Sequence, residues 1–311
     1  MKKIIRFVFF LFFITKASAQ QDPHFTQYMT NMSVINPAYT TGNASVLNLG
    51  SLYRYQWSGI KGAPRTITLF AHMPFYEKLE GGFSLISDDI GDGAKKETNF
   101  FADFAYNFQL NERQRIAFGV KAGVSAITTN FNGFRLNSGN STTDNAFAEN
   151  INETVPNIGV GAYFFGDKYY VGLSIPNLLS AEHIKFRPTI NSFGPQEIHT
   201  FFTGGYVLDI NEAFKLKPAF MTVFVKGAPV SVDLTANVLY NEKFELGAAY
   251  RFNDSVSLLM NVNVTPSLRI GYSYDYTTSN LSQFSSGSHE IVLLYTLNLL
   301  GKGYDKSPRF F

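Results

Sequence analysis

Apolar and polar residues alternate through nearly all of the chain after its first twenty residues. In one segment Val230, Val232, Leu234, Ala236 and Val238 alternate with Ser231, Asp233, Thr235 and Asn237. The same pattern recurs in residues 115–124, 244–252 and 268–276. Successive side chains of a β-strand face opposite sides, so each segment predicts a strand with one lipid-like face and one polar face.

The spacing of these segments predicts about 14 strands, an even number as in bacterial outer-membrane barrels. We expect them to begin near Leu47, Arg65, Gly81, Thr98, Gln114, Asn157, Tyr169, Ile198, Phe214, Pro229, Phe244, Val256, Leu268 and His289. The connections between consecutive strands fall into two alternating sets, one at each end of the predicted barrel. One set is short throughout, at 110–113, 166–168, 209–213, 241–243 and 265–267. The other set contains every long connection, at 128–156, 177–197 and 277–288.

This sorting of the connections distinguishes two all-β folds. Outer-membrane barrels have short periplasmic turns and longer external loops, and an even strand number leaves both termini in the periplasm. A soluble β-sandwich also alternates but has no reason to sort its loops in this way. The predicted fold class is therefore all-β, an antiparallel transmembrane β-barrel of the outer membrane.

The first residues have the three parts of a secretory signal peptide. Lys2 and Lys3 precede the apolar run 7–14, and Ala17-Ser18-Ala19 supplies a cleavage site. The run is shorter than the roughly 20 residues that a spanning helix needs. We therefore predict a signal peptide at 1–19, a periplasmic N-terminal segment at 20–44, a barrel at 45–300 and a periplasmic tail at 301–311. The N-terminal segment should lie at the periplasmic mouth or fold into the lumen.

Composition favours a membrane protein and argues against a nucleic-acid partner. The chain has 16% aromatic and 16% charged residues, whereas soluble domains have about 25% charged residues. The 31 Phe and 17 Tyr suit an aromatic-girdled barrel. The net charge is only +2, with dispersed Lys and Arg, and the absence of cysteine excludes disulfides and thiolate metal sites.

Local motifs do not predict an enzyme or a cofactor. Ser174 lacks the second glycine of a nucleophile elbow, and His289-Glu290 lacks the second histidine of a zinc protease. The acidic run 88–92 could bind calcium, but Asp and Gly are also the residues that turns use. We predict no catalytic, cofactor or metal residues.

Charged residues of both signs fall on the face that the alternation assigns to the barrel interior. They are Asp103, Lys121, Asp233, Glu245, Arg251, Arg269 and Asp275. Because opposite charges occur on neighbouring strands, these residues are candidates for a luminal network that pairs across the wall. We favour a structural role in which the pairs satisfy a polar interior, and the alternative hypothesis is that the network narrows or occludes the lumen.

Motifs spread over the mature chain resemble those of the PorP/SprF family of type IX secretion membrane proteins. The strongest are Asn36-Pro37-Ala38-Tyr39 and Arg54-Tyr55-Gln56-Trp57-Ser58-Gly59. Others are the runs 21–28, 172–178, 271–275 and 287–291. The resemblance implies an outer-membrane barrel that supports export or surface attachment of large cargo proteins, often gliding adhesins, and that contacts secretion components at its periplasmic face.

The motif residues have two interpretations, as a plug or as partner contacts. Pro37 fixes its own backbone angle and keeps Asn36 out of the helical region, which makes a rigid entry into the barrel. We favour the plug for Pro37 and Tyr39, and expect Trp57 to lie near the external interface after the first strand. Asn36, Pro37, Tyr39, Arg54 and Trp57 are therefore candidate plug or partner-contact residues.

The leading functional prediction is a type IX secretion barrel in the outer membrane of a Gram-negative bacterium. Its partners would be membrane lipid, secretion components and an exported surface protein. The alternative is an outer-membrane transport barrel for small or hydrophobic solutes.

Overall fold

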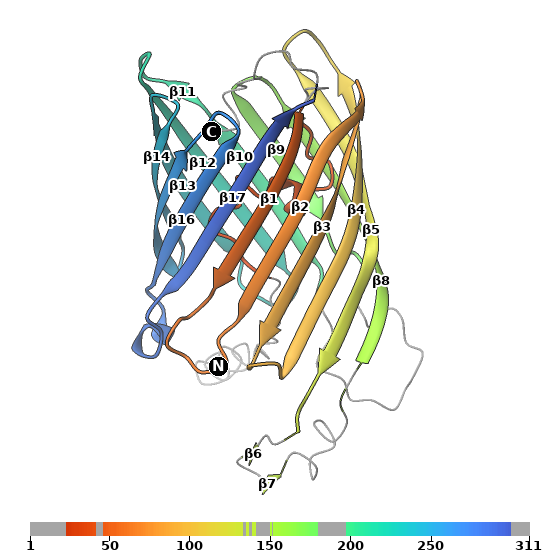
Figure 1. Ribbon diagram of the computed structural model, residues 1–311, viewed down its shortest axis with the longest axis vertical. Helices are drawn as coiled ribbons and strands as arrows, with labels where there is room; N and C mark the ends of the chain where they lie inside the picture. Colours follow the sequence, from red (N-terminus) through yellow and green to blue (C-terminus); the bar gives the residue numbers. More distant parts are fainter. Residues whose placement is uncertain are drawn as a thin grey trace, which may run out of the picture.

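The computed structural model is a closed antiparallel β-barrel with part of the chain inside it (Figure 1). It describes residues 23–41, 46–132, 135–136, 139–140, 150, 152–179 and 197–299. The main sheet contains 15 strands, of which two-residue β11 only extends the edge of β12, so the ring has 14. The predicted barrel and its strand number are confirmed.

The strands of the ring follow one another in sequence order, and pairing of β1 with β17 closes it. Their bounds are β1 Val46–Tyr55, β2 Arg65–Tyr76, β3 Leu79–Ile90, β4 Lys95–Gln109, β5 Arg115–Thr129, β8 Asn152–Phe165, β9 Tyr169–Ile175, β10 His199–Tyr206, β12 Phe214–Val225, β13 Ser231–Tyr240, β14 Phe244–Arg251, β15 Ser255–Asn263, β16 Leu268–Thr277 and β17 Ser288–Asn298. The remaining elements are α2 Met32–Ile35, β6 Arg135–Leu136, β7 Gly139–Asn140, β11 Leu208–Asp209 and the 3-10 helix η3 Asn280–Gln283.

Two strands begin earlier than the alternation predicts, at Lys95 instead of Thr98 and at Asn152 instead of Asn157. In both extensions the outward positions include polar residues, such as Lys96 and Thr154. Hydrogen bonding therefore continues beyond the apolar band, where hydrophobic alternation no longer marks a strand.

The connections define two ends of the barrel, which Figure 1 shows at its bottom and top. The long-loop end carries the connections 56–64, 91–94, 130–151, 176–198, 226–230, 252–254 and 278–287. The short-turn end carries 77–78, 110–114, 166–168, 207–213, 241–243 and 264–267. At one of these turns Asn241 and Glu242 have φ angles of 49° and 53°, the left-handed conformation that suits tight hairpins.

Large apolar side chains cover the outside of the ring. Phe83 and Leu246, for example, are 64% and 54% exposed, although they lie in the middle of the sheet. Exposed aromatic residues gather toward both strand ends: Tyr76, Tyr106, Phe108, Tyr206, Phe214, Tyr240 and Phe244 at the short-turn end, and Tyr53, Tyr250, Phe252 and Tyr276 at the long-loop end. Two aromatic girdles around an apolar band are typical of a barrel that spans a membrane.

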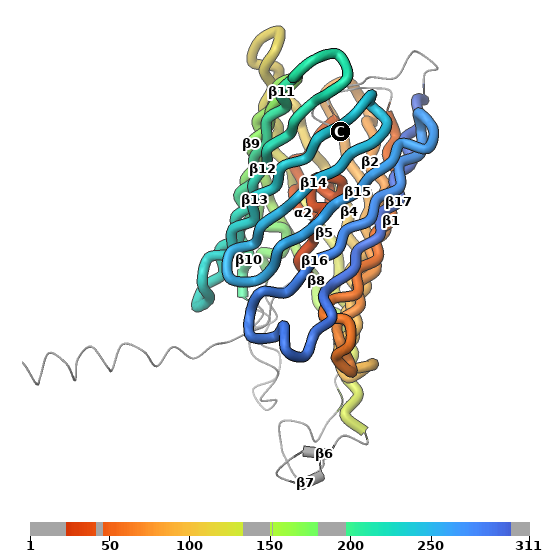
Figure 2. The backbone as a smooth tube through the Cα atoms, turned by 90° about the vertical axis from the view of Figure 1, so that its left-hand side faces the viewer, coloured from red at the N-terminus to blue at the C-terminus, as the bar shows by residue number. Residues whose placement is uncertain are grey.

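Residues 23–41, which we call the luminal segment, lie inside the barrel with their short helix α2 (Figure 2). Phe25, Tyr28, Met32, Ile35 and Ala38 are buried in one cluster with inward-facing wall residues. The wall partners are Leu52, Ala117, Tyr163, Phe165, Tyr170, Phe201, Ala219, Met221, Val223 and Val292. The inner face is therefore apolar where the segment packs, unlike the uniformly polar lining that alternation predicts.

No helix in the described ranges is long and apolar enough to cross a membrane. The predicted signal peptide, the C-terminal tail and residues 133–134, 137–138, 141–149 and 151 of the loop at 128–156 lie outside the described residues.

Candidate functional site

The luminal segment contacts the barrel wall at three levels, and the first is a buried ionic cluster near the long-loop end. Arg54 of β1 is 2% exposed and lies 2.8 Å from an Asp275 carboxylate oxygen and 3.0 Å from Glu290. The segment joins this cluster through Thr26, whose backbone N–H donates to Glu290 and whose hydroxyl donates to Asp275. The Gln27 N–H donates to the other Glu290 oxygen at 2.8 Å. The pairing of Arg54 with two carboxylates compensates for charges buried away from water.

The second level lies midway along the wall, where Lys121 of β5 donates to the Val34 carbonyl at 2.6 Å. Its ammonium group is 3.6 Å from Asp103 on the neighbouring strand and lies over the Phe101 ring. Ser174 of β9 donates to the next carbonyl, that of Ile35. These donors satisfy the carbonyls at the end of α2, which has no following helical turn to do so.

At the third level, toward the short-turn end, Asn36 and Pro37 lie against two glycines of the wall. The Asn36 amide donates to the Ala162 carbonyl at 3.1 Å, and its oxygen accepts from the Ala38 N–H at 2.9 Å. A Cβ at Gly161 would lie 2.1 Å from the Asn36 oxygen, and one at Gly119 would lie 2.2 Å from the Pro37 carbonyl oxygen. Only glycine allows this close approach.

The segment ends at another buried carboxylate, Glu80 of β3. The Thr41 N–H and hydroxyl donate to one Glu80 oxygen at 2.7 and 2.9 Å. The same oxygen lies 3.1 Å from His72 Nε2. The half-buried Tyr39 ring packs edge-on against His72 and Tyr163. Both ends of the segment are thus held by carboxylates of the wall.

Gly161→Leu should displace the luminal segment, because the new side chain would occupy the position of Asn36. Overpacking of this kind costs about 1–3 kcal/mol, which urea unfolding of the membrane-inserted protein would measure. Ala162→Leu is the matched control, since the neighbouring side chain points to the outside and its carbonyl remains available to Asn36. Equal unfolding midpoints for the two variants would contradict close packing at Gly161.

The predicted luminal charges that do not touch the segment pair with one another. Asp233 and Arg251 face each other on β13 and β14, with Arg251 Nε and Nη2 donating to the two carboxylate oxygens at 2.6 and 3.1 Å. Glu245 of β14 forms an ion pair with Arg269 of β16. The structure thus brings Arg54 and Asp275 into one cluster, and the other candidate charges into three separate pairs.

Trp57 lies in the connection between β1 and β2 at the long-loop end, two residues beyond β1. Its backbone N–H donates to the Ser288 hydroxyl at 3.0 Å, and its φ of 51° is left-handed. The Ser58 N–H donates to the Gly287 carbonyl. Trp57 is therefore part of a loop that is fixed to the start of β17, and it is not in contact with Asn36, Pro37 or Tyr39.

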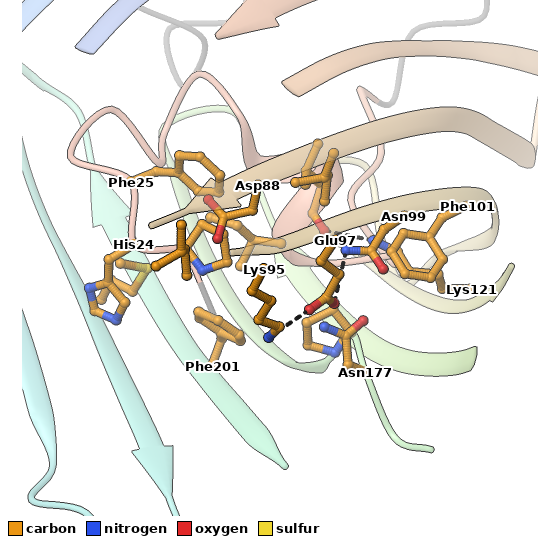
Figure 3. Close-up of a pocket in the computed structure, with 17 residues that line it drawn as sticks. His24, Phe25, Asp88, Lys95, Glu97, Asn99, Phe101, Lys121, Asn177 and Phe201 are labelled. Carbon is orange, nitrogen blue, oxygen red and sulfur yellow. Dashed lines mark hydrogen bonds and ion pairs between the residues drawn. The ribbon is translucent and has the colours of Figure 1, made fainter. Parts of the chain in front are cut away.

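Among the described residues, a cavity at each end of the barrel borders the segment, and the two share no lining residue. The cavity at the short-turn end has a volume of about 720 Å³ and is lined by Met29, Met32, Tyr39, Phe70, Lys215, Lys243 and Leu294, among others. The cavity at the long-loop end has about 80 Å³ and is bounded by Phe25, Asp88, Lys95, Glu97, Asn99 and Phe201 (Figure 3). At the rim of the short-turn end, an ion pair with Asp209 raises the pKa of exposed Lys168 and ties two turns together.

Thr26, Gln27, Glu80 and Glu290 form main contacts of the site, yet they are not among the site residues predicted from the sequence, although all but Glu80 lie in the motif runs 21–28 and 287–291. Thr26 and Gln27 precede the first strand, where no periodicity assigns a direction to the side chain. Glu290 is the partner of Arg54 in the β1–β17 register, and that pairing was the signal that could have identified it. In the described part of the chain, no group of three or more His, Cys, Asp or Glu is placed to hold a metal ion.

An apolar outer belt, two aromatic girdles and a closed antiparallel ring define a membrane β-barrel of the outer-membrane type, with an internal segment bound to its wall. The family model described as "Type IX secretion system membrane protein PorP/SprF" matches residues 17–295, so the chain belongs to that family. The family predicted from the motifs is confirmed.

Solved outer-membrane barrels resemble the chain weakly. They include Omp33 of Acinetobacter baumannii (9% identity, 83% of this chain and 100% of that one, TM-score 0.47) and a FadL homologue of Pseudomonas aeruginosa (11%, 92% and 96%, 0.46). The CymD monoaromatic hydrocarbon channel has 14% identity, with 88% and 92% covered and a TM-score of 0.49. No curated protein matches the sequence.

Proposed function

We propose that this barrel supports export or surface anchoring of a cargo protein by the type IX secretion system, and that it acts as a binding scaffold and not as an open pore. The supporting observation is the luminal segment, which is held by Glu290 and Asp275 near one mouth and by Glu80 near the other. A filled lumen suits binding at the mouths better than passage of solute. Family membership supplies the link to secretion.

The partners that fit this function are secretion components at the short-turn mouth and an exported surface protein, such as a gliding adhesin, at the long-loop mouth. In this proposal the short-turn end faces the periplasm, as in other outer-membrane barrels, and residues 1–19 are removed during export. Asn36, Pro37, Tyr39 and Arg54 act in the proposal as residues that hold the segment as a plug. Trp57 is the candidate for contact with a partner, because its loop lies at the long-loop mouth.

Deletion of the gene, followed by mass spectrometry of biotinylated surface proteins on intact cells, tests the proposal. Loss of one or a few large surface proteins, restored by the wild-type gene, would support it. An unchanged set of surface proteins together with slower uptake of small or hydrophobic solutes would instead establish the transport barrel. Turnover of a substrate by the purified protein would establish an enzyme.

A further inference from the structure

The luminal segment runs through the barrel in one direction, and its contacts with the strands fix that direction. β1 begins at the short-turn end and reaches the long-loop end at Tyr55, while β17 runs the opposite way (Figure 1). Thr26 contacts Glu290, the third residue of β17, and Arg54, the last but one of β1. Both positions are close to the long-loop end.

The last residues of the segment bind wall residues that lie closer to the other end. Val34 is bound by Lys121, in the middle of β5. Asn36 is bound by Ala162, three residues before β8 ends at the short-turn end. Thr41 is bound by Glu80, the second residue of β3, which begins at that end. These contacts start near the long-loop end and finish near the short-turn end, so the segment as a whole crosses the barrel in that direction. Its middle part is not a straight path, because Met29 and Ser33 line the cavity at the short-turn end, whereas Val34 and Ile35 line the cavity at the long-loop end.

The first described residues therefore lie at the long-loop mouth. Pro23, His24 and Phe25 line the small cavity together with Asp88, Ile90 and Lys95, which flank the turn between β3 and β4 (Figure 3). The far end of the segment leads to Val46, where β1 starts at the short-turn end. The two ends of the segment thus lie at opposite mouths of the barrel.

Long loops of outer-membrane barrels face the exterior and short turns face the periplasm. β17 ends at Asn298 on the short-turn side, so the C-terminal end of the ring belongs to the periplasmic side. The N-terminal end of the luminal segment belongs to the other side. The sequence predicts that the segment before the first strand lies at the periplasmic mouth or folds into the lumen, with both termini on the periplasmic side.

We propose that the Pro23 end of the luminal segment is exposed at the outer surface of the cell, where it forms, with the β3–β4 turn, part of the surface that meets an exported protein. The luminal segment is then a connector between the two mouths. The exposure follows from the path of the segment and the orientation of the barrel. The identity of the partner as an exported protein rests on the proposed function.

The absence of cysteine from the chain makes a direct test of exposure possible. Three single-cysteine variants would be expressed in the native host and treated with a membrane-impermeant maleimide before and after lysis. Pro23→Cys probes the start of the segment. Gln283→Cys is the control at the long-loop end, and Glu112→Cys the control at the short-turn end; both side chains are exposed.

We expect Pro23→Cys and Gln283→Cys to react in intact cells with no gain on lysis, and Glu112→Cys to rise from background to full reaction only after lysis. Reaction of Pro23→Cys only after lysis would overturn the proposal, as would a Gln283→Cys control that behaves like Glu112→Cys. Because Pro23 is half-buried, a peptide epitope inserted between Asp22 and Pro23 provides the second measurement. Antibody binding to this epitope only in permeabilised cells would equally overturn the proposal.

The outcomes for exposure and for secretion are separable. Outer labelling at Pro23 with an unchanged surface proteome in the deletion strain would keep the exposure and reject the secretion role. Loss of a surface protein in the deletion strain, with labelling only after lysis, would do the reverse.

Discussion

Arg54→Ala should lower the free energy of unfolding by about 3–5 kcal/mol, the cost of leaving buried charges without their partner. Asp275 and Glu290 would remain inside the wall, 2% and 1% exposed, beside Thr26 and Gln27. Urea unfolding of the protein in lipid vesicles can be followed by the emission of Trp57, the single tryptophan, whose loop is bonded to the start of β17.

Arg113→Ala is the matched control, because this arginine lies in an exposed turn and its loss should change stability by no more than about 0.5 kcal/mol. Adding Glu290→Gln to Arg54→Ala should recover part of the loss, since it removes one of the two unpaired carboxylates. If Glu290→Gln instead lowered the free energy of unfolding of Arg54→Ala further, the unpaired Glu290 charge would not be the cause of the first loss.

Deletion of residues 24–38 should convert a barrel whose lumen is blocked into one that conducts ions. These residues fill the space between the wall clusters, and a ring of 14 strands approaches the size at which porins leave an aqueous channel. We expect single-channel conductance in planar bilayers to rise by at least about ten-fold over the intact protein, whose lumen is filled.

Gly161→Leu serves as a second way to disturb the segment if the deletion variant fails to fold, and it should give intermittent openings that Ala162→Leu does not give. A large and stable conductance of the intact protein would contradict occlusion by the segment. A folded deletion variant that remained closed would show that the wall charges or the loops close the barrel by themselves.

Strand number, most strand starts and the direction of the wall side chains could be predicted because all three depend on an alternation that lipid imposes. Asp103, Lys121, Asp233 and Arg251 were placed on the inner face by their parity alone, and they are buried there. The odd or even position of a residue in its strand does not tell which charged residue of another strand lies at the same height in the lumen. The pairing of Arg54 with Asp275, two strands away, therefore could not be derived.

The apolar inner residues show a second limit of sequence reasoning. Tyr163, Phe165, Phe201 and Met221 occupy positions where a polar lining was expected, because they pack on the luminal segment and not on water. Residues 23–41 have no period-2 pattern, so the sequence does not reveal the surface that these side chains contact. Pro37 and Tyr39 were recognised as candidates from their motif, but the glycines that admit them, Gly119 and Gly161, are visible only in three dimensions.

The seam between β1 and β17 has a consequence for biogenesis. Arg54 and Glu290 are register partners across that seam, and the Glu290 carboxylate accepts from the backbone of Thr26 and Gln27. The luminal segment is enclosed by an uninterrupted hydrogen-bonded ring of strands. It therefore either enters before β1 pairs with β17 or has to thread through the finished barrel. The former route requires no threading, and it makes insertion into the bilayer and capture of the N-terminal peptide parts of a single assembly step.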